Sequence, residues 1–343
     1  MQKSSIHIVK EQISKSKKIV IISHYNPDGD AVGSSLALFH FFRHQGLDAR
    51  VILPNPFPDF LNWMPGSEYV LIGYKHLNTA KRMLEEADML FVVDMNAAHR
   101  SGRDLEDPIR NSPAFKVLID HHPNPNLTCN YQYSTTKTTS TCELVYNFMA
   151  KRLKQKADIT LEAARCIYTG MITDTGSLSY ACNNPNTYRI LSHIVKMGVN
   201  GEEIHRLVYD NYSESRMKLL GLSLCKRMNV LSEYATSIIY LSLKDLADFG
   251  YQMGDTEGFV NYGLSMKTVV FTAFFIQRED RIRISFRSKG SFDVGQFAAK
   301  HFGGGGHRNA SAANYYSSLE EAIAEFKRIL PQYQEEIVKF LGK

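Results

Sequence analysis

The fold is decided by the stretch KIVIISHYNPDGD, residues 18–30. It contains four consecutive apolar residues and ends with two carboxylates, Asp28 and Asp30, which one glycine separates. A short apolar run of this kind is typical of a strand that is buried on both faces, as in a parallel sheet. The apolar spacing after it predicts a helix over residues 31–45. We therefore expect His24 and both carboxylates to lie between the end of a buried strand and the start of a helix.

Three further clusters of Asp and His residues accompany apolar runs later in the chain. Asp94 follows MLFVV, the triplet Asp120-His121-His122 follows FKVLI, and Asp174 lies in TGMITDTG. We expect each of them at the end of a buried strand. In open α/β sheets the functional groups gather beyond the carboxyl ends of the strands. The four clusters are therefore predicted to meet at one edge of a sheet.

The length and the pattern of the chain together predict two domains. At 343 residues the chain exceeds the roughly 250–300 residues at which a single core stops growing. Residues 1–195 are expected to form the first domain; strand and helix signals alternate through its first 120 residues, which favours an α/β fold with a doubly wound parallel sheet. Residues 196–230 are expected to form a helical linker, and residues 231–343 a smaller, strand-rich domain.

Individual elements follow from the same patterns. The expected strands are residues 18–23, 48–53, 69–72, 89–94, 115–120, 236–243, 267–276 and 281–287. The expected helices are residues 5–16, 31–45, 77–86, 294–301 and 319–341, with a largely helical stretch from 139 to 230.

The composition limits the classes of partner. A net charge of +5 is compatible with an anionic substrate but is too small for a surface that coats nucleic acid. The five cysteines form no CxxC pair, so we expect reduced thiols in a cytoplasmic protein. No segment approaches the roughly 20 apolar residues of a membrane span, and the N-terminus lacks a signal-peptide pattern. No membrane partner is expected.

The residue types in the four clusters are those of a metal site. Carboxylates with a few histidines suit Mn²⁺ or Mg²⁺, and imidazole favours Mn²⁺. The lack of a thiolate in any cluster argues against structural zinc. Two divalent ions roughly 3.5–4 Å apart can activate water and brace a phosphoryl group. Asp94, which stands alone after its strand, suits a carboxylate that bridges both ions. A lone Asp-x-Asp is usually a solvated turn, so the prediction depends on all four clusters together.

A run of four glycines, residues 303–306, precedes His307 and Arg308. Glycines cost backbone entropy on folding, so the chain must need unusual φ values or very close approach there. Exposed amides in such a loop make an anion-binding nest, to which His307 and Arg308 add donors. The alternative is a flexible hinge. Two more cations are candidates for a phosphate contact: Arg287, which precedes Ser288, and Arg100, shortly after Asp94.

Together these motifs resemble the DHH–DHHA1 phosphoesterase family, and the resemblance covers nearly the whole chain. Within the family the layout is most similar to the NrnA-type nanoRNases, which degrade very short RNAs and dephosphorylate 3′-phosphoadenosine 5′-phosphate. The resemblance implies a metal-dependent hydrolase with short single-stranded RNA or nucleotide substrates, and a mixed sheet in the second domain. It leaves open a homodimer. The alternatives are a cyclic di-AMP or linear pApA phosphodiesterase, a pyrophosphatase, a RecJ-type single-strand exonuclease and a non-catalytic RNA-binding protein.

The resemblance also implies a role for each candidate residue. One Mn²⁺ or Mg²⁺ would be held by His24, Asp28 and Asp94. A second ion would be held by Asp30, Asp94, His121 and Asp174. Asp120 would orient ligands, and His122 would face the scissile phosphate. The nucleotide would be gripped by Arg287, Ser288, Gly305, Gly306, His307 and Arg308. Ala312 departs from the family pattern, because it stands where a glycine is usual; if that position needed a positive φ, the loop would have to relax.

Overall fold

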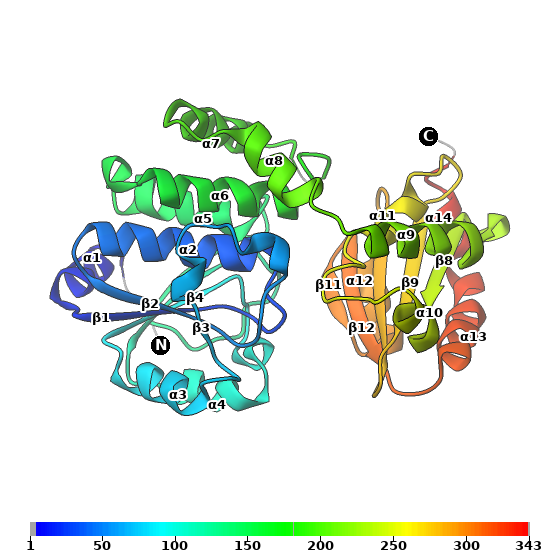
Figure 1. Ribbon diagram of the computed structural model, residues 1–343, viewed down its shortest axis with the longest axis horizontal. Coiled ribbons are helices and arrows are strands. Elements are labelled where there is room, and N and C mark those ends of the chain that lie inside the picture. The colour runs from blue at the N-terminus through cyan, green and yellow to red at the C-terminus, as the bar shows by residue number, and fades with distance from the viewer. Residues whose placement is uncertain (1–4, 181, 342–343) are drawn as a thin grey trace. The chain divides into compact units, whose positions relative to one another are not determined.

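The computed structural model describes residues 5–180 and 182–341. The chain divides between Asn211 and Tyr212 into two compact units, each built around a six-stranded sheet (Figure 1). None of the described helices is both long enough and apolar enough to cross a membrane. All five cysteines are free thiols, and three of them are buried.

The first unit contains an entirely parallel sheet, as the alternating pattern predicted. The strand order is β3-β2-β1-β4-β5-β6, and every neighbouring pair is parallel. The strands are β1 (Lys18–Ile22), β2 (Asp48–Leu53), β3 (Leu71–Ile72), β4 (Met89–Val93), β5 (Phe115–Asp120) and β6 (Tyr131–Ser134). β6 was not predicted, because it is a partly exposed edge strand without an apolar run.

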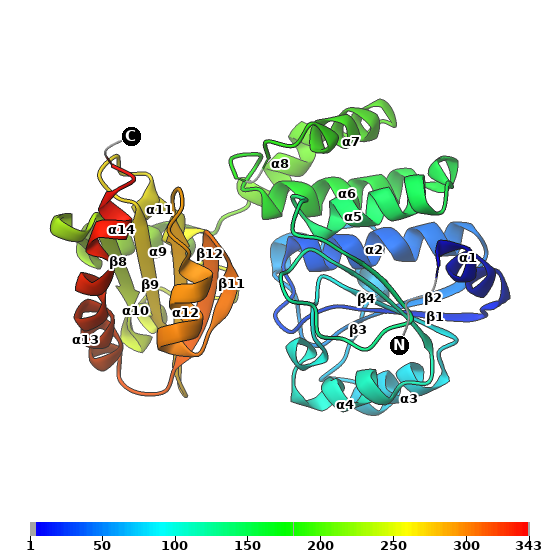
Figure 2. The same cartoon turned by 180° about the vertical axis from the view of Figure 1, so that it is seen from behind.

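Helices cover both faces of this sheet (Figures 1 and 2). Successive residues of β1 point to opposite faces of the sheet. Ile19 and Ile21 pack in the core that contains residues of α1, α2, α5 and α6, whereas Val20 and Ile22 pack in the core that contains residues of α3 and α4. The helices are α1 (Ile6–Lys15), α2 (Gly29–His44), α3 (Leu77–Glu86), α4 (Arg103–Asn111), α5 (Thr141–Asn147), α6 (Leu161–Asp174), α7 (Pro185–Lys196) and α8 (Gly201–Tyr209). The doubly wound arrangement is therefore confirmed.

Asp174 does not follow a strand, and this part of the prediction was wrong. It is the last residue of α6, whose start is capped by the Thr160 side chain, an acceptor for the amide of Ala163. Met171 and Ile172 belong to the buried face of that helix. A short apolar run cannot by itself distinguish a strand from a buried helix, which explains the error.

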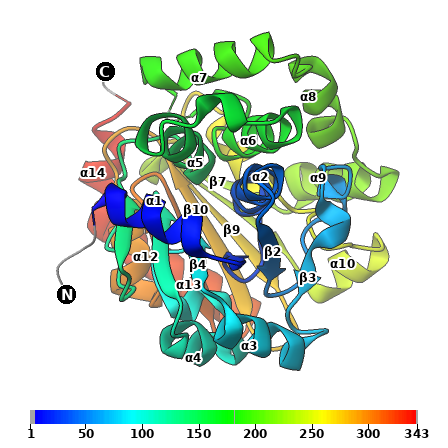
Figure 3. The same ribbon diagram turned by 90° about the vertical axis from the view of Figure 1, so that its left-hand side faces the viewer.

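Two glycines allow α2 to lie very close to α6, beside which it runs in Figures 1 and 3. A Cβ atom on Gly33 would lie 2.6 Å from the carbonyl oxygen of Cys166 in α6. A Cβ atom on Gly170 would overlap the Cys142 sulfur and lie 3.0 Å from Oδ1 of Asp30. The contact therefore requires hydrogen in place of a side chain at both positions.

The second unit contains a mixed sheet, as the family resemblance implied. Its order is β11-β12-β10-β9-β8-β7, and β8–β9 is the one parallel pair. The strands are β7 (Met228–Leu231), β8 (Thr236–Leu241), β9 (Phe271–Gln277), β10 (Ile282–Ser288), β11 (Gly305–His307) and β12 (Ala310–Tyr315). The helices are α9 (Glu214–Lys226), α10 (Leu243–Asp248), α11 (Phe259–Leu264), α12 (Val294–Phe302), α13 (Leu319–Ile329) and α14 (Gln334–Val338).

The glycine run is not an open loop. Gly303, at φ 60°, ends α12, and Gly305 and Gly306 begin the edge strand β11, which pairs with β12. A Cβ atom on Gly304 would lie 2.6 Å from that of Ala313, so close approach explains this glycine. Ala312 lies within β12, opposite Gly305, and it does not belong to the described residues that have a positive φ. The departure at Ala312 therefore requires no change in the loop.

Replacing Gly33 with Ala is expected to destabilise the protein by about 1–3 kcal/mol, because the backbone of α6 must move to admit the methyl group. Gly221→Ala in α9 is the matched control, since nothing lies within 4 Å of its added Cβ atom. That variant is expected to gain up to about 1 kcal/mol from helix propensity. Urea unfolding followed by circular dichroism measures both changes, and equal effects would contradict the close contact.

Candidate metal centre

The candidate centre lies where three parallel strands of the first unit end. His24 comes shortly after β1, Asp94 directly follows β4, and Asp120 is the last residue of β5. The register aligns these ends, with Ile22 opposite Val92 and Val93 opposite Ile119. The crossover topology thus brings together residues that lie far apart in the sequence.

Asp94 is the hub of the cluster. Its two carboxylate oxygens face different histidines: Oδ2 lies 3.3 Å from Nε2 of His24, and Oδ1 lies 3.4 Å from Nε2 of His121. The residue is 1% exposed and holds an unusual backbone φ of 53°. Its amide donates to the carbonyl of Ile119, 3.1 Å away, which fixes the turn that directs the carboxylate. This geometry suits a carboxylate that contacts two cations.

Among the described residues of the first unit, potential ligand atoms form three groups, and Asp94 belongs to all of them. The groups are His24, Asp28 and Asp94; Asp30, Asp94 and His121; and Asp94, Asp120 and His122, with the ligand atoms of each within 4.8 Å of one another. Asp174 joins the second group, because its Oδ2 lies 3.5 Å from Nε2 of His121. The fold thus brings together all four sequence clusters, including the one at a helix end.

The HYNPDGD loop is fixed by hydrogen bonds at both ends. Oδ1 of Asp28 caps α2 by accepting from the amides of Asp30 and Ala31, at 3.0 and 3.1 Å. Asn26 and Asn55 bind each other reciprocally: the Asn26 amide donates to Oδ1 of Asn55, and Nδ2 of Asn55 donates to Oδ1 of Asn26. Sequence reasoning missed Asn55, whose sole signal is a polar residue in a proline-rich loop.

His24 is oriented as a ligand would be. Its Nδ1 lies 3.0 Å from the carbonyl oxygen of Tyr25, and a proton on Nδ1 leaves the lone pair of Nε2 directed toward Asp94. A histidine that binds a metal commonly donates its other ring N–H in this way. The hydrogen-bond partner therefore selects the tautomer that a cation needs.

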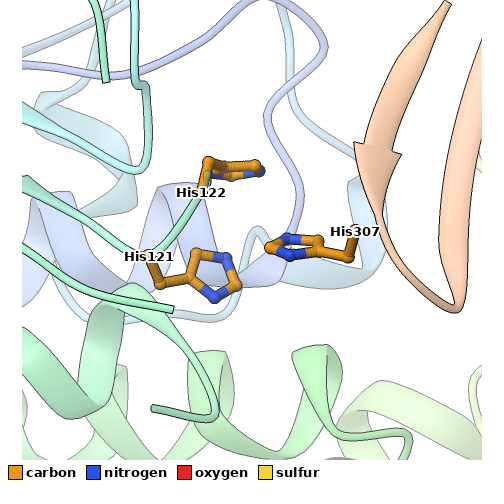
Figure 4. A group of neighbouring side chains, drawn as sticks. All are labelled: His121, His122 and His307. Carbon is orange, nitrogen blue, oxygen red and sulfur yellow. The ribbon is translucent and has the colours of Figure 1, made fainter. Parts of the chain in front are cut away.

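Asp120 and His122 form a close pair beside these ligands. Nδ1 of His122 lies 2.8 Å from Oδ1 of Asp120, and the His122 amide donates to Oδ2 at 3.1 Å. Burial, followed by the charge of Asp94, raises the pKa of Asp120 to about 7. Burial lowers the pKa of His122 to about 3, so the ring that shares this hydrogen bond with Asp120 is neutral. Figure 4 shows its ring turned across that of His121; their planes differ by 71°.

The electrostatics of the cluster fit a bound cation. Burial and then the charges of Asp94, Asp174 and Asp28 raise the pKa of Asp30 well above its ordinary value. Burial also acts to raise the pKa of Asp94, but the hydrogen bond to His24 and the neighbouring histidines outweigh it and hold that pKa low. Cys142 belongs to none of the ligand groups found among the described residues, and burial raises the pKa of its thiol. A site that crowds carboxylate oxygens and imidazole nitrogens together, with too little positive charge nearby to balance the carboxylates, suits a hard divalent cation.

Arg100 lies beside this cluster, and its positive charge counteracts protonation of His24 and His122. Its Nη1 is buried and has no hydrogen-bond partner among the described residues. A buried guanidinium nitrogen without an acceptor costs free energy unless a ligand supplies one. The arrangement is therefore suited to an anionic group.

The remaining candidates lie in the second unit. Arg287 and Ser288 end β10, the residues Gly305, Gly306 and His307 form β11, and Arg308 follows as an exposed residue; Figure 4 labels His307. The Ser288 hydroxyl donates to the carbonyl of Phe292 at 2.7 Å and accepts from Nδ2 of Asn309 at 2.9 Å. Ser288 therefore ties the end of β10 to its neighbouring loops, and Asn309 is a partner that sequence reasoning missed.

Comparison with known proteins gives two family matches. The DHH family N-terminal domain matches residues 18–171, and the DHHA1 domain matches residues 235–336. The bifunctional oligoribonuclease and PAP phosphatase NrnA of Bacillus subtilis is 24% identical, over 94% of this chain and 97% of its own. The cyclic-di-AMP phosphodiesterase GdpP of Bacillus subtilis is 23% identical, over 96% of this chain and 50% of its own.

A solved structure extends the likeness to three dimensions. An exopolyphosphatase-related protein from Bacteroides fragilis is 41% identical, with a TM-score of 0.92, over 98% of this chain and 97% of its own. Because the two domain models match the two units and these relatives span nearly the whole chain, the protein belongs to the DHH–DHHA1 phosphoesterase family and is a hydrolase.

Proposed function

We propose that the protein hydrolyses very short RNA oligonucleotides and 3′-phosphoadenosine 5′-phosphate with the help of two divalent cations, Mn²⁺ before Mg²⁺. The observation that carries the proposal is the carboxylate of Asp94, whose two oxygens face two separate groups of ligand atoms. The name of the NrnA relative, which aligns over nearly its whole length, supports this choice of substrates.

The two groups divide the ligands between two cations. His24, Asp28 and Asp94 would hold one, and a second would be held by Asp30, Asp94, His121 and Asp174. When bound, two such cations supply positive charge that activates a water molecule and offsets the charge of the phosphoryl oxygens. The mixed carboxylate and imidazole donors favour Mn²⁺ over Mg²⁺, which binds nitrogen less readily.

Two residues beside the ligands would act on the substrate. We assign to His122 a place against the scissile phosphate, with its ring orientation held by the hydrogen bond from Nδ1 to Asp120. We propose that Arg100 donates a hydrogen bond to a phosphate oxygen of the substrate. That oxygen would be the acceptor that the buried Nη1 of Arg100 lacks.

The second unit would bind the nucleotide. Arg287, His307 and Arg308 carry the donors, and the glycines at positions 305 and 306 leave β11 without side chains ahead of His307. Ser288 would contribute indirectly, by holding the end of β10. We also assign the enzyme to the cytoplasm, where short RNA fragments and nucleotides arise.

Turnover of a 5′-labelled diribonucleotide and of 3′-phosphoadenosine 5′-phosphate with Mn²⁺ tests the proposal. We expect both substrates to be hydrolysed, and Asp94→Asn to lower the rate by more than the roughly 10–100-fold typical of losing a residue behind a metal ligand. Asp107→Asn, an exposed carboxylate on α4, is the matched control and should retain full activity. Cyclic di-AMP hydrolysed faster than either substrate, or full activity in Asp94→Asn, would contradict the proposal.

The role of Arg100 can be tested separately. Arg100→Ala is expected to lower kcat/KM by roughly 10- to 150-fold, the equivalent of the about 1.5–3 kcal/mol of a hydrogen bond to a charged group. Mn²⁺ affinity should stay near the wild-type value, because Arg100 belongs to none of the ligand groups. Arg103→Ala, an exposed cation at the start of α4, controls for net charge. Equal kcat/KM values for the two variants would remove Arg100 from the phosphate contact.

A further inference from the structure

The start of α5 contacts the candidate metal centre through its backbone. Both oxygens of the Asp30 carboxylate accept from the first two amides of the helix: Oδ2 from Thr141 at 2.6 Å and Oδ1 from Cys142 at 2.8 Å. Ser140 precedes these residues as the helix cap and accepts from the Glu143 amide. Amides at a helix start carry partial positive charge, so they stabilise the ionised carboxylate and fix its orientation.

The Thr141 side chain reaches a second carboxylate of the same centre. Its Oγ1 donates to Oδ1 of Asp94 at 2.8 Å, so a single residue holds Asp30 through its amide and Asp94 through its hydroxyl. These partners lie 111 and 47 residues away in the sequence. Thr141 is completely buried and therefore cannot meet a substrate. Its amide and its hydroxyl both donate to proposed ligands, so its influence on the centre would act through them.

Glu143 fixes the start of α5 in place. The sequence Ser140-Thr141-Cys142-Glu143 has the pattern of a capping box, in which the Glu side chain would return to the cap amide. The carboxylate instead accepts from the hydroxyls of Thr139 and Thr187 at 2.7 and 2.9 Å, and from the Asn186 side chain at 2.7 Å. It thereby ties α5 to the preceding loop and to the first turn of α7, which makes the helix start a rigid support.

We propose that Thr141 is a positioning residue that sets the placement of Asp94 relative to Asp30, and thereby the affinity of the centre for divalent cations. The proposal rests on the metal centre of the proposed function. The oxygen of Asp94 that Thr141 binds is also the one that lies 3.4 Å from Nε2 of His121. Without the hydroxyl, the carboxylate can rotate about its terminal torsion, which is intrinsically broad, and the ligand group loses its arrangement.

Two substitutions separate the hydroxyl from the other contributions of Thr141. Thr141→Val keeps the shape of the side chain and both amides to Asp30 but removes the donor to Asp94. Thr141→Ser restores the donor with a smaller side chain. Thr272→Val in the second unit is the matched control, because Thr272 is also completely buried and its hydroxyl makes a 2.7 Å hydrogen bond to Ser237.

The experiment is titration of each full-length protein with Mn²⁺, with free Mn²⁺ measured by electron paramagnetic resonance and thermal unfolding followed in parallel. We expect Thr141→Val to weaken Mn²⁺ binding by about 10–100-fold and to reduce the rise in Tm that Mn²⁺ causes. Thr141→Ser should bind within a few-fold of wild type. Thr272→Val should lower the Tm without a change in Mn²⁺ affinity.

Wild-type Mn²⁺ affinity in folded Thr141→Val would overturn the role of Thr141 and leave the metal centre intact. A wild-type protein that binds no Mn²⁺ would overturn both the centre and the inference. Equal weakening in Thr141→Val and Thr141→Ser would also overturn it, because the hydroxyl would then not be the cause. If circular dichroism finds Thr141→Val unfolded, Thr141→Ala is titrated in its place with the same criteria.

Discussion

The metal centre depends on how closely α2 approaches α6. Gly33 and Gly170 leave no room for side chains at that contact, and the space is taken by the backbone of α6 and the sulfur of Cys142. Asp30 lies in the first turn of α2 and Asp174 ends α6, so the spacing of the two helices determines how near these carboxylates come to His121. A larger residue at Gly33 or Gly170 would push the two helices apart and so separate the carboxylates of Asp30 and Asp174. Packing between helices is therefore the first condition for the chemistry.

Electrostatics set the second condition. Carboxylates crowded into a buried site repel one another, and the raised pKa of Asp30 reflects burial and that repulsion together. His24 and His121 face different oxygens of Asp94, and the hydrogen bond to His24 is the largest of the contributions that lower the pKa of Asp94. The amides of α5 direct partial positive charge at Asp30. A divalent cation would supply the positive charge that is still missing, and its binding would then stabilise the fold.

The sequence predicts the parallel sheet and the strand-end residues because apolar runs followed by Asp or His carry their own signal. His24, Asp94 and Asp120 are predicted in this way, and the rule that functional groups gather beyond the carboxyl ends of strands in open α/β sheets predicts that they lie together. Asp174 was identified as a member of the site but was expected at the end of a strand, although the stretch from 139 to 230 was predicted to be largely helical; it ends the helix α6. The strands β6, β11 and β12 were not predicted, because their glycine, alanine and polar residues lack the apolar pattern of a buried strand. The edge strand β7 was also missed, and the prediction of a helical linker over residues 196–230 was wrong where β7 begins at Met228.

Residues that act through others were the hardest to predict. Asn55 and Thr141 are ordinary polar residues in the sequence, and their importance comes from partners that only the fold supplies. The contribution of Thr141 and Cys142 to Asp30 comes from backbone amides, which every residue but proline offers, so no choice of side chain marks it. The residues Ser140 to Glu143 match a capping box, yet Glu143 binds side chains of the neighbouring helix α7 and not its own cap. The proposed ligands of this centre can therefore be recognised from sequence motifs. The backbone amides that fix the orientation of those ligands lie outside the motifs and become visible only in the fold.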